Sequence, residues 1–358
     1  MKKTICILMA SAVLILSLLG IFLPKAEFSL WERRRLAELP KLTMSSLLDG
    51  SYMSAFEKYA PDAFPLRDSF RMLKSVFDRS ILGKWDKNGV YLKNGYAAAM
   101  EYPLNTESIR RASEKFRFIY ERYLTEENRI YLSVIPDKNY FLAPESGRLS
   151  LDYRLLTDTL REDMPYARYI DIFPHLTLED YYKTDTHWRQ EKLLPAANAI
   201  LSAMGKEQLA EFRENTLDIP FYGVYRGQLA LPMKSERIVY LTDGRDYTVY
   251  DYENSREIGM YDMEKAQGND PYEMFLSGSL SLIKIKNNDP DSQGRLIIFR
   301  DSFGSSIAPI LAPSYSEVVL VDIRYIRSDF LGAFVDFSDA DILFLYSTLV
   351  LNNSDTFK

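Results

Sequence analysis

The sequence has few residues of the kinds that bind metals or form covalent cross-links, with one cysteine and two histidines among 358 residues. Because Cys6 is the single cysteine, a disulfide within the chain and a thiolate metal site are both excluded. So few thiol and imidazole ligands argue against a zinc enzyme, and we expect neither a metal nor an organic cofactor. Long basic runs are also missing and the net charge is −6, so we expect no nucleic-acid partner.

The first residues have the pattern of an export segment. Lys2 and Lys3 precede an uncharged apolar run, from Ile5 to Leu23, which ends at Pro24. The run is about as long as the ~20 residues that cross a bilayer, and no clear cleavage motif follows it. We therefore expect residues 1–24 to be an uncleaved signal anchor in the cell membrane, with the main domain outside the cytoplasm. A cleaved signal peptide, which would release the protein, is the alternative.

The remaining sequence divides at about residue 100. Residues 25–100 contain turn-forming prolines, two short helical patterns and a hairpin signal at Asn94-Gly95, and their function is not evident. Residues 101–358 alternate short apolar strand patterns with helical patterns, which predicts an α/β domain with a mostly parallel sheet and helices on both faces. Residues near 207–294 interrupt this alternation. They are polar and rich in tyrosine, and we expect an irregular insertion there.

Two separate stretches carry residues suited to nucleophilic catalysis. Asp185 stands two residues before His187, and Ser302 follows the predicted strand Arg295–Phe299. A serine hydroxyl needs a base to accept its proton, and the base needs a third group to orient it. In an extended segment, Asp185 and His187 point to the same side, and sites form at the carboxyl ends of parallel strands. We therefore expect the three side chains to meet as a triad.

Five further residues are weaker candidates for binding substrate or stabilising an oxyanion: Tyr182, Trp188, Gly223, Gly304 and Arg324. The backbone amide of Ser302, just before a predicted helix, is an expected oxyanion donor, and Trp188 is expected to wall the imidazole. Each signal also has a purely structural interpretation. An Asp-x-His pair is commonly a local hydrogen bond, Asp301 is expected to be a cap or turn former, and His175 is interpreted as structural.

The stretch Tyr181-Tyr-Lys-Thr-Asp-Thr-His-Trp188 resembles the signature of the DHHW family of bacterial envelope proteins. Thr186 stands where that family usually has the first of two histidines. Five further stretches resemble the family in order and spacing: Glu32–Pro40, Phe64–Asp68, Asn88–Leu92, Ile135–Lys138 and Arg300–Phe303. The family is similar to the SGNH hydrolase-like domain of the periplasmic alginate O-acetylation proteins, in which Asp-x-His also precedes the serine.

This resemblance implies an SGNH-like (flavodoxin-like) fold, with Asp185, His187 and Ser302 as acid, base and nucleophile. It further implies acyl transfer to or from a cell-envelope polysaccharide, with acetyl as the expected group. Transfer would require a membrane-bound acyl-donating partner, whereas an esterase would need none. The alternative is a catalytically silent glycan-binding or polysaccharide-assembly protein on the same fold. The tyrosine-rich insertion favours that alternative, as does Arg300, which stands where a Gly-Asp-Ser motif has its glycine.

Overall fold

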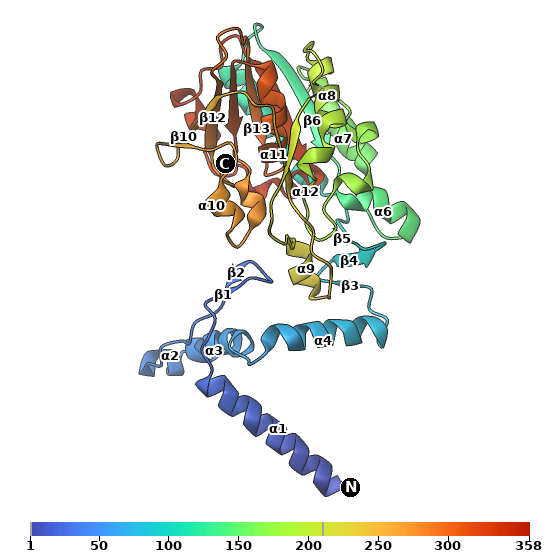
Figure 1. The fold of residues 1–358 in the computed structure, drawn as a ribbon, viewed down its shortest axis with the longest axis vertical. Coiled ribbons are helices and arrows are strands. Elements are labelled where there is room, and N and C mark those ends of the chain that lie inside the picture. Colours follow the sequence, from blue (N-terminus) through green and yellow to red (C-terminus); the bar gives the residue numbers. More distant parts are fainter. Residues whose placement is uncertain (1, 210) are drawn as a thin grey trace. The chain divides into compact units, whose positions relative to one another are not determined.

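The computed structural model describes residues 2–209 and 211–358, which form two compact units (Figure 1). The first unit contains residues 2–88 together with Arg226–Met233, and the second contains Gly89–Tyr225 and Lys234–Lys358. The division differs from the expected one near residue 100, because the hairpin that follows residue 88 packs within the second unit.

The first unit begins with a long apolar helix, as the sequence predicts. In this helix, α1 (Lys2–Phe22), the span Lys3–Gly20 has a mean hydropathy of 2.1 and is long and apolar enough to cross a membrane. The other elements of the unit are short: β1 (Phe28–Ser29), β2 (Arg34–Arg35), α2 (Met44–Leu48), α3 (Ser51–Asp62), α4 (Arg67–Ser80), β3 (Asp86–Lys87) and most of α9 (Val224–Leu229). The two predicted helical patterns correspond to α3 and α4.

An eight-stranded sheet forms the centre of the second unit, in the order β11-β10-β12-β14-β13-β15-β6-β7. Its strands are β6 (Arg129–Ile135), β7 (Arg168–Tyr169), β10 (Tyr247–Asp251), β11 (Arg256–Ile258), β12 (Leu282–Asn287), β13 (Arg295–Arg300), β14 (Glu317–Val321) and β15 (Asp341–Ser347). The run from β14 to β7 is parallel, whereas β12, β10 and β11 extend the sheet beyond β14 in antiparallel fashion. The predicted mostly parallel sheet is confirmed.

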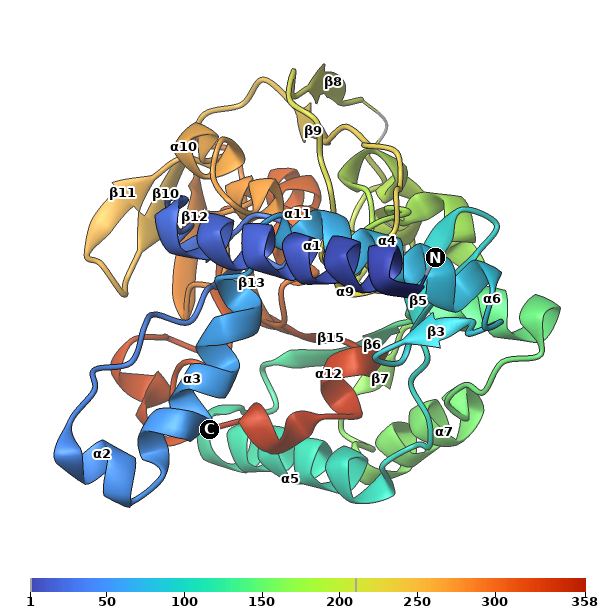
Figure 2. The ribbon, with the colours of Figure 1, turned by 90° about the horizontal axis from the view of Figure 1, so that it is seen from below.

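Helices cover both faces of this sheet, as predicted, and Figure 2 shows α5 and α11 on opposite sides of the strands. Along β13, Ile297 and Phe299 pack in the core beneath α5 (Thr106–Tyr123) and α7 (Tyr153–Asp163). Leu296 and Ile298 pack in the opposite core with α8 (Leu194–Ala203) and α11 (Gly304–Leu311). Since successive side chains of a strand alternate between faces, a strand that is buried on both faces must be apolar throughout.

The remaining elements of the second unit are short. They comprise the hairpin β4 (Val90–Lys93) and β5 (Tyr96–Ala99), the pair β8 (Arg213–Thr216) and β9 (Val239–Thr242), the helices α6 (Lys138–Ser146), α10 (Met263–Ala266) and α12 (Thr348–Leu351), and the 3-10 turns Phe173–His175, Leu178–Asp180, Gln190–Lys192, Pro271–Met274, Ala312–Ser314, Ser328–Ala333 and Ser354–Thr356. Asn94 and Gly95 have φ angles of 52° and 82°, which suit the predicted type I′ turn. Tyr91 of this hairpin is buried against Leu142 of α6.

The stretch near 207–294 is more regular than the sequence indicates. It contains β8 to β12, and three of these strands join the central sheet. In β12, Ile283 and Ile285 are buried, whereas Lys284 is partly exposed and Lys286 is exposed. The expected irregular insertion is therefore limited to the connections between these strands.

Candidate active site

A short closed loop carries the acid and the base of the predicted triad. Tyr181 and Trp188 pair as an isolated β-bridge at its two ends. Inside this bridge, the Tyr182 N–H donates to the His187 carbonyl oxygen at 3.1 Å. Residues 183–186 therefore form a short loop between the two paired ends, and Asp185 lies in this loop.

The structure brings Asp185, His187 and Ser302 together in one hydrogen-bonded chain. The His187 Nδ1 atom lies 2.7 Å from Asp185 Oδ1, and His187 Nε2 lies 2.8 Å from Ser302 Oγ. The second carboxylate oxygen, Asp185 Oδ2, accepts a hydrogen bond from the Val224 N–H at 3.0 Å. When Nδ1–H donates to the carboxylate, Nε2 presents its lone pair to the serine hydroxyl, which is the arrangement that nucleophilic activation requires.

Exposure differs along this chain of three residues. Asp185 is fully buried, whereas the His187 side chain is 13% exposed and Ser302 is partly exposed. The acid is therefore shielded from water, and this burial strengthens its interaction with the imidazole. The nucleophile remains accessible.

Ser302 lies at the carboxyl end of β13, on a turn that Asp301 stabilises. The Asp301 carboxylate accepts hydrogen bonds from the Phe303 N–H at 3.0 Å and from the N–H of Ser347, the last residue of β15, at 2.8 Å. Asp301 is thus the turn former that the sequence predicts. Within residues 2–209 and 211–358, the Ser302 N–H has no hydrogen-bond acceptor, so it can donate to an oxyanion.

Aromatic rings enclose the imidazole, but the main contact comes from an unexpected residue. Tyr272 stacks on His187 with a centroid separation of 4.0 Å and an interplanar angle of 14°. The Tyr272 hydroxyl donates to Ser306 Oγ at 2.8 Å, which fixes the ring. Trp188, the expected wall, is buried instead beside Phe303, and its Nε1–H also donates to Ser306 Oγ at 2.8 Å. No motif marks Tyr272 in the sequence.

Two of the weaker candidates belong to the packing behind the acid. Tyr182 is fully buried and packs edge-on against Phe221 at 4.9 Å, so it does not face a substrate. The Gly223 N–H donates to Thr184 Oγ1 at 2.9 Å and is not a donor to an oxyanion. A Cβ at Gly223 would lie 2.3 Å from the Cα of Asp185. The lack of a side chain at Gly223 therefore permits close packing against the acid, which corrects its predicted role.

Gly304 and Arg324 also have structural partners. A Cβ at Gly304 would lie 2.5 Å from the Cβ of Arg300, so Gly304 makes room for that buried arginine rather than for a substrate. The Arg324 guanidinium donates to the buried Asp322 carboxylate at 2.6 and 2.9 Å, and the Arg300 guanidinium lies 3.6 Å from the same carboxylate. Arg324 is thus held at the end of β14 by an ion pair.

Lys138 is the functional candidate that the sequence did not reveal. Its side chain follows β6, is 2% exposed, and donates from Nζ to the carbonyl oxygens of Tyr182 at 2.8 Å and Lys183 at 3.4 Å. Burial lowers the pKa of Lys138 from 10.5 to about 7, against the opposing effects of the Asp185 and Glu236 charges. Lys138 therefore ties the loop that carries the acid and the base to the start of α6, just after β6.

Glu236 holds the same loop from a second element. Its carboxylate accepts the N–H groups of Lys183 at 2.8 Å and Thr184 at 2.9 Å, together with the Thr184 hydroxyl at 2.7 Å. Thr186, which departs from the DHHW pattern, is partly exposed. The Asp185–His187 and His187–Ser302 contacts form with threonine at this position.

No protein-family model and no curated protein sequence matches this chain. Solved structures with the same fold include a DHHW family protein from Eubacterium siraeum, with a TM-score of 0.60 and 20% identity over 76% of this chain and 95% of that one. Bacillus cereus PatB1 matches with a TM-score of 0.58 and 18% identity over 75% of this chain and 98% of that one. A PatB1 structure with a sulfonyl adduct matches at 0.55 and 17%, over 73% and 97%.

The O-acetyltransferase domain of Pseudomonas putida AlgJ also matches, with a TM-score of 0.45 and 11% identity over 74% of this chain and 92% of that one. This likeness is too remote to inform function. The likeness to the DHHW family protein and to PatB1 establishes a shared fold, in agreement with the resemblance found in the sequence.

Proposed function

We propose that this protein is an SGNH-like serine O-acyltransferase or esterase that acts on a cell-envelope polysaccharide outside the cytoplasm. The observation that carries the proposal is the pair of hydrogen bonds, 2.7 and 2.8 Å long, that link Asp185, His187 and Ser302. The partly exposed serine at a strand end and the buried acid further support it, because a nucleophile must be reachable and its orienting carboxylate fixed.

In the proposed reaction, Ser302 Oγ attacks the carbonyl carbon of an acyl ester while its proton moves to His187 Nε2. Asp185 stabilises the resulting imidazolium, and the Ser302 N–H donates to the oxyanion. His187 then returns the proton to the leaving alcohol as the ester bond breaks, which leaves an acyl group on Ser302. A glycan hydroxyl in transfer, or water in hydrolysis, attacks this acyl-serine in the second half-reaction and restores the free serine.

The apolar helix α1 supports a membrane anchor with the α/β unit on the outer side. For transfer, a membrane-bound partner would deliver the acyl group, with acetyl as the expected group. A cleaved signal and a released esterase would suit the same triad. Detection of α1 peptides in protein extracted from membranes distinguishes the anchored form from the cleaved form.

The test is hydrolysis of an artificial acetyl ester by the wild type and by two matched serine variants. Ser302→Ala removes the proposed nucleophile and should reduce turnover to background. Ser305→Ala alters a buried serine of the adjoining helix whose hydroxyl has no hydrogen-bond partner in the described part of the chain, and should retain full turnover. Equal rates for the wild type and Ser302→Ala would eliminate the enzyme proposal.

The second candidate is a catalytically silent protein that binds a glycan or assists polysaccharide assembly. The buried Arg300, at the position of the glycine in a Gly-Asp-Ser motif, favours this alternative because the turn is built differently from an active Gly-Asp-Ser site. Glycan binding that persists in an inert wild type, and equally in Ser302→Ala, would support it.

A further inference from the structure

Helix α4 exposes its apolar side chains rather than burying them. Phe70, Leu73 and Phe77 recur at helical spacing and are 42%, 65% and 51% exposed. Leu66, just before the helix, is 64% exposed, and Ile81, just after it, is 68% exposed. These five residues form one stripe, which we call the apolar face of α4.

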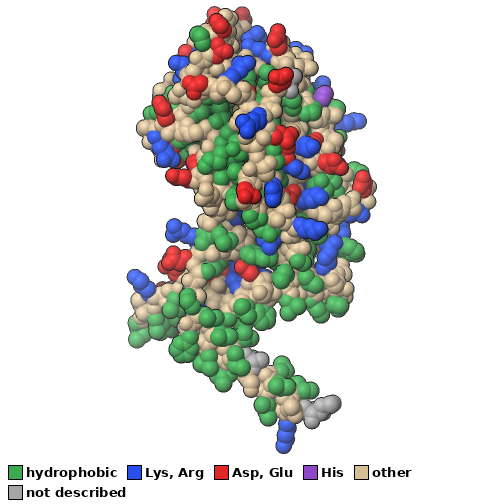
Figure 3. Space-filling model, viewed as in Figure 1, with side chains coloured by type: hydrophobic (Ala, Val, Ile, Leu, Met, Phe, Trp, Pro, Cys, Tyr) green, Lys and Arg blue, Asp and Glu red, His purple; other side chains and the backbone are tan. Residues whose placement is uncertain are grey.

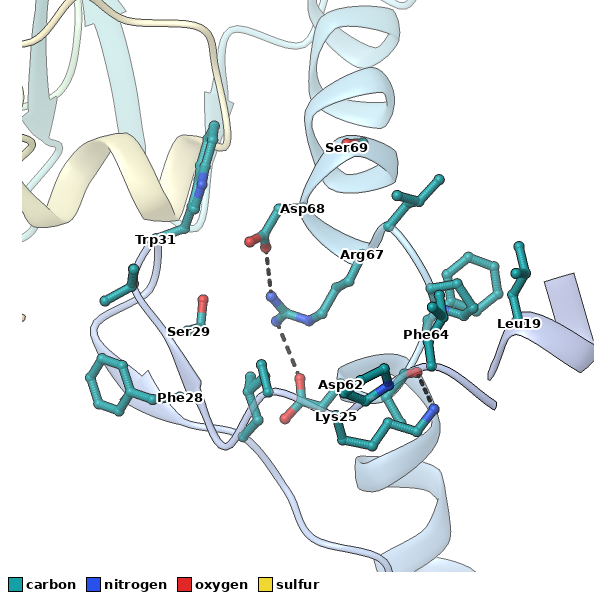
Figure 4. A pocket seen from close by; sticks show the side chains of 18 residues that line it. Leu19, Lys25, Phe28, Ser29, Trp31, Asp62, Phe64, Arg67, Asp68 and Ser69 are labelled. Atoms are coloured by element: carbon teal, nitrogen blue, oxygen red, sulfur yellow. Dashed lines mark hydrogen bonds and ion pairs between the residues drawn. The ribbon is translucent and has the colours of Figure 1, made fainter. Parts of the chain in front are cut away.

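The opposite side of α4 is charged and packs inside the first unit. Arg71 Nη2 lies 2.9 Å from the Glu32 carboxylate, and Arg67 is paired with Glu32 as well. Arg67 also lies 3.2 Å from Asp62, which in turn pairs with Arg34 at 2.7 Å, and Figure 4 shows Arg67 between Asp62 and Asp68. A helix at the surface of a water-soluble domain normally has the reverse arrangement, with its charges outward.

The exposed apolar surface continues beyond α4. Figure 3 shows hydrophobic side chains gathered over α2, α3 and α4. On α3, Met53 is 53% exposed and Phe56 is 37% exposed, and on α2 the side chain of Leu48 is 82% exposed. Trp85, beyond α4, is 59% exposed. Single exposed apolar residues are ordinary, but a contiguous group of this kind marks a surface that another phase or molecule covers.

This surface is continuous with the end of the membrane-length helix. Lys25, just after α1, donates to the Gly20 carbonyl oxygen within the helix and to the Ala63 carbonyl oxygen at 3.2 Å. A pocket of about 450 Å³ lies between the two segments, lined by Leu19 and Leu23 on one side and by residues around Leu66 on the other (Figure 4). The start of the apolar face is thus adjacent to the point where α1 ends.

We propose that the apolar face of α4, with the exposed apolar residues of α2 and α3, lies in the interface of a lipid bilayer. Amphipathic helices bury such faces at the boundary between headgroups and acyl chains. Lys74 is exposed beside Phe70 and Phe77 on the helix, and its long side chain can reach the headgroup phosphates. The inference is independent of the catalytic proposal, since it concerns the first unit alone.

The test places a polarity-sensitive fluorophore at single positions of the full chain, reconstituted in vesicles of phosphatidylcholine and phosphatidylglycerol. Cys6→Ser removes the native thiol, and Leu73→Cys then labels the apolar face. Lys58→Cys is the matched control, because Lys58 is exposed on the side of α3 away from Met53 and Phe56. Phe70→Cys is a second apolar-face variant, in case Leu73→Cys does not fold.

We expect the label at residue 73 to emit at shorter wavelength and to be quenched several-fold more strongly by lipids with brominated acyl chains than the label at residue 58. Iodide in the water should quench the two labels in the reverse order. Equal quenching of both labels by iodide would overturn the proposal. Disulfide dimers formed on oxidation of the unlabelled Leu73→Cys protein, without quenching of the labelled protein by brominated lipid, would also overturn it and identify a second copy of the chain as the occupant.

Discussion

Replacing Lys138 with methionine is expected to change how the free energy of unfolding depends on pH. The folded chain holds this lysine in a site where its pKa falls from 10.5 to about 7. Because the folded pKa lies below the unfolded pKa, the unfolded chain binds more protons between these two values, and stability rises with pH across that window. Below about pH 7 Lys138 carries its proton in both the folded and the unfolded chain, so burying its charge destabilises the folded chain by the full amount.

The magnitude follows from the size of the shift. One pKa unit corresponds to ~1.4 kcal/mol, so the wild type should gain up to ~1.4 kcal/mol per pH unit within the window. Over the whole interval from about 7 to 10.5 the gain reaches about 5 kcal/mol, which is an upper value. Lys138→Met abolishes this slope. It also leaves the Tyr182 carbonyl oxygen without the Lys138 donor, which costs ~1–3 kcal/mol at every pH.

The assay is urea unfolding at several pH values from about 6 to about 10, with the difference between variant and wild type taken at each pH so that other titrating groups cancel. Lys286→Met, which alters an exposed lysine of β12, serves as the control and should run parallel to the wild type. If the curves of the wild type and Lys138→Met are also parallel, Lys138 is not titrating in a buried site. Equal stability of the two proteins at about pH 10 would refute its proposed role in holding the loop.

Four further substitutions, at three residues, address the site itself. Asp185→Asn should lower kcat for ester hydrolysis by ~10⁴ with little loss of folding, because the imidazole loses its orienting acceptor; a loss of less than tenfold would contradict this. Gly223→Ala should destabilise the fold by ~1–3 kcal/mol in urea unfolding and reduce the rate of hydrolysis, because the new Cβ would lie 2.3 Å from the Cα of Asp185. Unchanged stability and an unchanged rate would refute the packing role of Gly223. Tyr272→Phe should lose only ~1 kcal/mol of stability in the same unfolding assay and keep its activity. Tyr272→Ala should lose more stability and also its activity, because the stacked ring covers His187. Equal activity in the two variants would contradict this.

Much of the α/β architecture could be predicted because its signals are local. The strand predicted over Arg295–Phe299 extends one residue further in the structure, where β13 ends at Arg300. The position of Ser302 just after β13 follows from the same logic. The strand order was not predictable, because nothing local to Asp341–Ser347 indicates that β15 lies between β13 and β6.

The supporting residues of the site were harder to predict, because their roles depend on what approaches them in space. Gly223 and Gly304 were predicted to bind substrate or to help form the oxyanion hole, whereas the groups packed against them are Asp185 and Arg300. Tyr272 lies in a segment without a recognisable motif. Lys138 belongs to a motif of the resemblance, yet only the folded chain reveals its contact with the Tyr182 carbonyl oxygen.

The central claim, that Ser302 is a nucleophile activated by His187, is tested most directly by trapping the acyl-enzyme. The protein is mixed with an activated acetyl ester, the reaction is quenched with acid, and the protein is digested. The mass of the peptide that contains Ser302 is then measured by mass spectrometry. We predict one acetyl group on Ser302 in the wild type and none on this peptide in Ser302→Ala or His187→Ala. An unmodified Ser302 in the wild type, or equal acetylation in His187→Ala, would contradict the account.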